Sequence, residues 1–214
     1  MEAFKKIKLD TDELLDAFKL KRNHKCEVLG ELLGTTGHIE PEALRVLEQK
    51  RQRLIVEGDF WNEEELKMHF LAFLFDFARI DEEGKIKLFY ERPLSAILGE
   101  YKITVKCDAL IATPKGIGTP KKPYFFLQEF KKQKRQEDDA EGQMLAAMLI
   151  AQHENATGLP VYGAYLQGKN WTFTTLHERN YCVSKQFDAT DEADLHQILL
   201  ALRQLKVLIL RQLD

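Results

Sequence analysis

The sequence predicts an α/β fold in which helices flank a mixed central sheet. Apolar residues recur at helical spacing at both ends of the chain, whereas β-rich runs fill much of the region between them. The segment Gln167-Gly168-Lys169-Asn170 separates two β-rich runs and is a hairpin signal. Residues 140–153 are apolar nearly all round a helix, which indicates a buried helix between strands.

The first segment, residues 1–60, is predicted to be a helical appendage that packs on a domain formed by residues 61–214. Apolar residues follow helical spacing from Leu14 to Phe18, and Pro41 is well placed to open a later helix. The chemistry of a site is not evident in this segment. A role in partner binding or dimerisation is the alternative.

The next helix is marked by a capping box, in which Asn62 is the N-cap and Glu65 lies three positions later. Its apolar face runs from Leu66 to Phe77. At about 100° per residue, Glu63 lies about 45° from the centre of that face and Glu64 roughly 145° away. Glu63 is therefore the glutamate that points most nearly toward the sheet.

Six β-rich runs follow this helix. They cover residues 85–90, 101–112, 125–131, 161–166, 171–176 and 181–187. We expect Pro93 to end the first run, and residues 113–123, rich in glycine, proline and lysine, to form a turn. Thr190 or Asp191 then caps a long apolar-striped helix at the end of the sequence.

Two neighbouring strands carry the residues that point to chemistry. Asp108 lies within one β-rich run, and the next run ends in Glu129-Phe130-Lys131. Residues i and i+2 of a strand share a face, so Glu129 and Lys131 lie side by side. Two carboxylates can hold Mg²⁺, with Mn²⁺ as a substitute, and a lysine can position an attacking water. This is the arrangement of a metal-dependent phosphodiester-cleaving site.

In these residues the chain resembles the PD-(D/E)XK nuclease superfamily, including its RecB-like members and the nuclease domain of type I restriction subunits. The matching positions are Asp108, the segment Glu129-Phe130-Lys131 and Gln143 in the following helix, although Cys107 replaces the proline of the motif. The resemblance covers about Trp61–Thr175. It implies a restriction-endonuclease-like fold with a four-stranded mixed core sheet, Mg²⁺ dependence and a nucleic-acid substrate.

From this resemblance we expect a nuclease that acts on DNA rather than RNA, although RNA remains possible. Asp108 and Glu129 would bind the metal, Glu63 would complete the acidic cluster, Lys131 would position water, and Gln143 would lie beside the site. The expected phosphate contacts are Lys132, Lys134 and Arg135. Each of these residues also has a simpler interpretation. Glu63 would be an ordinary acid in the first turn of a helix, and Glu129 and Lys131 would be an ion pair on an edge strand. Lys132, Lys134 and Arg135 would be a solvated basic run.

The overall composition narrows the protein class. The chain has 214 residues with a net charge of −3, so a nucleic-acid surface would have to be a local basic patch. Three widely spaced cysteines suit a reduced cytoplasmic protein, and we expect neither a signal peptide nor a membrane partner. A homodimer is possible. The alternatives are a non-catalytic nucleic-acid-binding or regulatory protein on the same fold, and an interaction protein without a nucleic-acid role.

Overall fold

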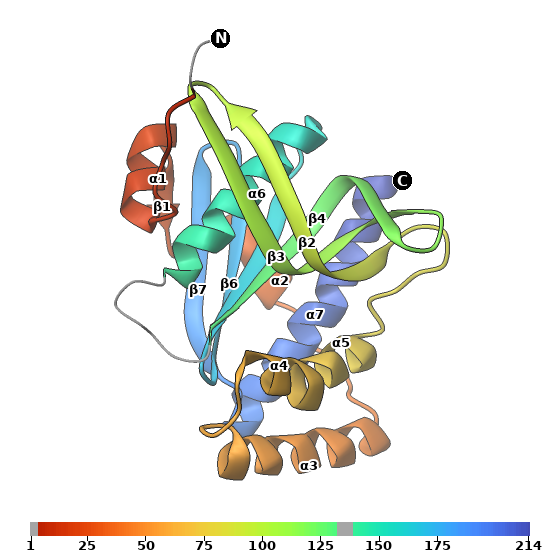
Figure 1. Cartoon of the computed structure of the whole chain (residues 1–214). Coiled ribbons are helices and arrows are strands. Elements are labelled where there is room, and N and C mark those ends of the chain that lie inside the picture. The colour runs from red at the N-terminus through yellow and green to blue at the C-terminus, as the bar shows by residue number, and fades with distance from the viewer. Residues whose placement is uncertain (1–3, 132–138) are drawn as a thin grey trace.

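The computed structural model describes residues 4–131 and 139–214, which form a mixed α/β fold around one sheet (Figure 1). Within these residues the sheet has seven strands in the order β1-β7-β6-β5-β4-β3-β2. The strands are β1 (Lys21–Asn23), β2 (Lys87–Leu98), β3 (Tyr101–Lys115), β4 (Thr119–Lys131), β5 (Val161–Gln167), β6 (Asn170–His177) and β7 (Asn180–Asp188). The helices are α1 (Thr11–Phe18), α2 (Glu27–Leu33), α3 (Pro41–Glu57), α4 (Glu63–Leu66), the π-helical η1 (Lys67–Leu71), α5 (Ala72–Ala78), α6 (Ala140–Asn155) and α7 (Glu192–Leu213).

The sheet is mixed, as the sequence predicts. β4 pairs with β5 in parallel and β1 pairs with β7 in parallel, whereas the other neighbouring strands are antiparallel. A parallel pair needs a crossover connection, and α6 lies in the connection between β4 and β5. The predicted hairpin is also confirmed, because β5 and β6 are antiparallel. β5 ends at Gln167, and β6 begins at Asn170.

Two hydrophobic cores lie on the two faces of the sheet. One contains the buried face of α6 together with Leu14 of α1. The other is built by α2, α3, the helical segment from α4 to α5, and α7. Figure 1 shows α3, α4 and α5 gathered at one end of the molecule. The sheet is thus covered by helices on both faces, which buries strands such as β5 almost completely.

The helix predicted from Asn62 is present, with the expected capping box. The Asn62 side chain accepts a hydrogen bond from the Glu65 backbone N–H (2.9 Å), and the Glu65 carboxylate accepts one from the Asn62 N–H (2.7 Å). The helix is not regular, because η1 forms a π-helical turn between α4 and α5. π-helical turns are rare and often lie at functional sites. The spacing of 100° per residue therefore fails after Leu66.

Two predicted strand ends are wrong. β2 does not end at Pro93 but continues to Leu98. Because β2 is the edge strand next to β3, the missing N–H of Pro93 interrupts no second ladder. Residues 113–123 are also not one long turn: β3 and β4 extend to Lys115 and from Thr119, with register shifts along the pair.

The first segment of the chain packs closely on the rest of the fold. It is not wholly helical, because β1 pairs in parallel with β7. Cys26, at the start of α2, forms a disulfide with Cys182 of β7, which differs from the reduced cysteines expected from the sequence; Cys107 is free and buried. Across residues 4–131 and 139–214, none of the helices combines the length and apolar composition needed to cross a bilayer.

Candidate functional site

The candidate site lies where β3 and β4 separate. Their ladder runs from the Lys115–Thr119 pair to its last pair, Ala109 with Gln128. Immediately beyond the last pair, a side chain replaces the backbone carbonyl as the hydrogen-bond acceptor. Asp108 Oδ2 accepts a hydrogen bond from the Phe130 N–H at 2.8 Å. The side chain of Asp108 is therefore fixed against β4, beside Glu129.

Glu129 and Lys131 form a buried ion pair on β4. Lys131 Nζ lies 3.1 Å from Glu129 Oε1, and the two side chains are 18% and 7% exposed. The pKa of Glu129 is raised to about 7, because burial and the charge of Asp108 raise it and together outweigh Lys131, which lowers it. Burial alone would lower the pKa of Lys131, but Glu129 outweighs it and holds that pKa above its ordinary value. Lys131 is therefore a protonated donor at neutral pH.

The acidic helix opening approaches this pair. Glu63 is the first residue of α4, and its negative charge contributes to the raised pKa values of both Glu129 and Lys131. Glu64 instead contacts Lys67 at 3.2 Å and remains 74% exposed, while Glu65 closes the capping box. The three glutamates thus have three different surroundings. A metal-binding role for Glu63 stays a prediction.

Two residues that sequence reasoning missed complete the cluster. The Lys67 ammonium lies 2.8 Å from Asp108 Oδ1, 2.7 Å from Glu91 Oε1 and 3.2 Å from Glu64 Oε1, with a side chain only 11% exposed. Burial would lower the pKa of Lys67, but these carboxylates hold it above its ordinary value. Glu91 also pairs with Lys106, and hydrogen bonds from Lys106 and Lys67 lower its pKa to about 2.

The sequence offered only weak signals for these two residues. Lys67 lies four positions after Glu63, which for an ordinary amphipathic helix suggests a solvated ion pair. Glu91 falls where the sequence predicts the end of a strand. In the structure Glu91 has a left-handed backbone conformation (φ 55°) inside β2, which is uncommon for a residue other than glycine. This local bend lies where β2 passes Asp108.

The remaining predicted residues are less closely connected to the cluster. Gln143 is half-buried in the first turn of α6, and no contact between its side chain and that of Glu129 is seen in the described part of the chain. Its neighbour Glu141 forms a two-pronged ion pair with Arg22 (2.8 and 3.1 Å) and accepts a hydrogen bond from Tyr165 (3.0 Å). Lys132, Lys134 and Arg135 lie outside the described residues.

The donor set fits a hard divalent cation, although the described acids, histidines and cysteines include no group of three or more that could hold a metal ion. Mg²⁺ is usually held by one or two carboxylates and keeps several waters. Asp108 and Glu129 supply two carboxylates, which is the type and number of ligand that Mg²⁺ needs.

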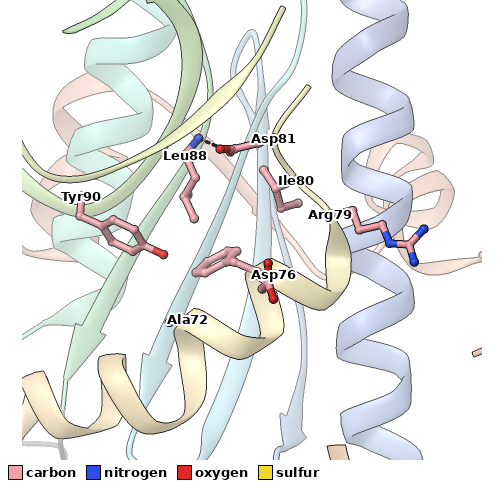
Figure 2. Close-up of a pocket in the computed structure, with 8 residues that line it drawn as sticks. Ala72, Asp76, Arg79, Ile80, Asp81, Leu88 and Tyr90 are labelled. Atoms are coloured by element: carbon pink, nitrogen blue, oxygen red, sulfur yellow. Dashed lines mark hydrogen bonds between the residues drawn. The ribbon is translucent and has the colours of Figure 1, made fainter. Parts of the chain in front are cut away.

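A separate cavity of about 420 Å³ lies between α5 and β2. Figure 2 shows that Tyr90 and Leu88 of β2 line it together with Asp76 of α5, and that Asp81 accepts a hydrogen bond from the Leu88 N–H (2.8 Å). Burial raises the pKa of Tyr90, and the two aspartates add to this effect. The cavity is lined by none of the residues of the predicted site.

The structure thus brings Asp108, Glu129 and Lys131 together and adds Lys67 and Glu91 to them. The arrangement places the carboxylates of Asp108 and Glu129 beside each other, with a half-buried lysine next to each of them. In comparisons with known proteins, no family model and no curated protein matches this chain. The geometry of these side chains is therefore the basis for assigning a function to this chain.

Proposed function

We propose that this protein is a Mg²⁺-dependent phosphodiesterase, a nuclease that acts on DNA, with a restriction-endonuclease-like arrangement of its central strands. The observation that carries the proposal is the meeting of Asp108 with the buried Glu129–Lys131 pair where β3 and β4 separate. Buried ionised groups are costly, and those with strongly shifted pKa values often mark functional sites.

The charge of the cluster supports dependence on a metal. The carboxylates are those of Glu63, Glu64, Glu91, Asp108 and Glu129, and the lysines are Lys67, Lys106 and Lys131. Five carboxylates and three lysines leave a formal net charge of −2 when all are ionised. A phosphodiester would be repelled by this charge unless a divalent cation accompanied it.

The residues of the chain have separate roles in this proposal. Asp108 and Glu129, with the Phe130 carbonyl as a further donor, would hold the cation. The cation supplies charge neutralisation and makes a bound water more acidic. Lys131 stays protonated, so it donates a hydrogen bond that orients the attacking water and does not act as the base. The Phe130 N–H fixes the Asp108 carboxylate for this task.

The second candidate function is nucleic-acid binding or regulation on the same fold without cleavage. It is favoured by one observation: Asp108 Oδ1, an oxygen that a metal would need, contacts the Lys67 ammonium at 2.8 Å. A non-catalytic descendant of such a site would keep its carboxylates satisfied by lysines in this way. DNA binding that weakens with salt, without metal-dependent cleavage, would support this second function.

Cleavage of supercoiled plasmid DNA tests the primary proposal. With Mg²⁺ or Mn²⁺ we expect nicked and linear products, and with a chelator none. Lys131→Ala should lower the cleavage rate by about 100-fold or more. The matched control is Lys102→Ala, the same change at an exposed position near the start of β3. Unchanged cleavage by Lys131→Ala would show that the assigned mechanism is wrong. RNA of the same sequence serves as the competing substrate.

A further inference from the structure

Lys67 occupies the position that a cation beside Asp108 would need. Its ammonium contacts three carboxylates and lies 5.7 Å from the centre of the Phe130 ring. We propose that Lys67 is the resident counter-ion of Asp108 and that a divalent cation binds there only by displacing it. This inference rests on the proposed function and adds a regulatory residue to the same site.

Competition follows from the two oxygens of Asp108. Oδ2 accepts the hydrogen bond of the Phe130 N–H, which ties the carboxylate to β4. Oδ1 is the other oxygen that could bind a ligand, and it accepts a hydrogen bond from the Lys67 ammonium. An ammonium and a divalent ion on the same oxygen repel strongly at this burial, because the local dielectric is low. The two cations therefore exclude each other at Asp108.

The displaced lysine has other partners within reach. Glu91 Oε1 lies 2.7 Å and Glu64 Oε1 lies 3.2 Å from the Lys67 ammonium, and both side chains are more exposed than Asp108. A lysine side chain has a flexible four-carbon stem, so a small rotation can break the contact with Asp108 while it keeps those with the glutamates. Lys67 can therefore leave Asp108 without becoming an unpaired buried charge.

Lys67 lies at the junction between α4 and the π-helical turn. Lys67 is the first residue of η1, and its side chain is 11% exposed, whereas its neighbour Met68 is 67% exposed. A charged side chain thus points inward and an apolar one outward at the start of η1, opposite to the usual preference. Such an inversion costs stability, which is consistent with a functional role for Lys67.

Mn²⁺ binding, measured by titration calorimetry or electron paramagnetic resonance at one pH, tests this inference without reference to activity. Lys67→Met should bind Mn²⁺ about tenfold or more tightly than the wild type, and Lys67→Gln should do the same if the methionine variant folds poorly. Lys67→Arg keeps the cation and should stay within about threefold of the wild type.

Lys106→Met is the matched control. It removes one lysine charge beside Glu91, as Lys67→Met does, but leaves the Lys67–Asp108 contact in place. We expect it to change the Mn²⁺ affinity by less than about threefold. Urea unfolding without metal should show Lys67→Met to be less stable than the wild type, so that stability and affinity move in opposite directions. A purely structural role for Lys67 would lower both.

The outcomes separate this inference from the proposed function. If Lys67→Met and Lys67→Gln bind Mn²⁺ as well as the wild type or more weakly, displacement is wrong while a metal site remains. If Lys106→Met gains as much affinity as Lys67→Met, the effect is general electrostatics and the inference fails. If none of the proteins binds Mn²⁺, the metal-dependent function itself fails and the inference with it.

Discussion

The buried Glu129 carboxyl predicts a specific dependence of stability on pH. Its pKa in the folded protein is about 7, against an ordinary value of 4.5, because burial and the charge of Asp108 disfavour the ionised form. The folded state therefore binds this proton more tightly than the unfolded chain does. Stability from this group is complete below about pH 4.5 and is lost as the pH rises through 7. At 1.36 kcal/mol per pH unit, the whole effect is about 3 kcal/mol.

The perturbation is Glu129→Gln, which keeps the shape of the side chain and removes its titration. Urea unfolding of both proteins at several pH values from about 4 to 8 gives the difference in free energy of unfolding. We expect the wild type to lose about 3 kcal/mol relative to Glu129→Gln across this range. Glu83→Gln, at an exposed turn, controls for the loss of one charge. A difference that stays flat with pH would refute the assigned surroundings of Glu129.

Two further predictions concern the stability of the fold. Reduction of the Cys26–Cys182 disulfide, which spans a sequence separation of 156, should lower the free energy of unfolding by about 2–4 kcal/mol. Urea unfolding with and without reductant measures this difference. The double variant Cys26→Ser, Cys182→Ser should show no response to reductant. Gly163→Ala on β5 would place a Cβ within 3 Å of side-chain atoms of Thr174 and of α6, and should cost about 1–3 kcal/mol. A Cβ added by Gly30→Ala in α2 would have no atom within 4 Å, so this variant should be neutral or more stable by up to about 1 kcal/mol. Equal losses of stability at the two glycines would contradict the packing described.

Much of the fold could be predicted because local signals agree with the tertiary structure. The capping box at Asn62, the hairpin at Gln167–Asn170 and the cap of α7 at Asp191 each depend on a few neighbouring residues. β1 could not be predicted in this way, because three exposed polar residues form a strand only when β7 is beside them. The course of β2 past Pro93 likewise depends on its place at the sheet edge.

The candidate site was predictable in part for a related reason. Asp108, Glu129 and Lys131 lie on strands, where the period of two residues fixes which side chains share a face. Lys67 and Glu91 lie at irregular backbone, namely the start of a π-helical turn and a left-handed residue within a strand. Neither irregularity has a sequence signal comparable to a capping box. A regular helical wheel consequently cannot place the residues that follow Leu66.

The pairing of β1 with β7 has a consequence for the order of folding. During synthesis, residues 21–23 leave the ribosome long before residues 180–182, their partners in the sheet. Until then the apolar side chains of α1 and α2, such as Leu14 and Leu32, have no core in which to pack, since that core includes α6 and α7. The nascent chain must keep these segments from aggregating, so a binding site for chaperones is expected early in the chain.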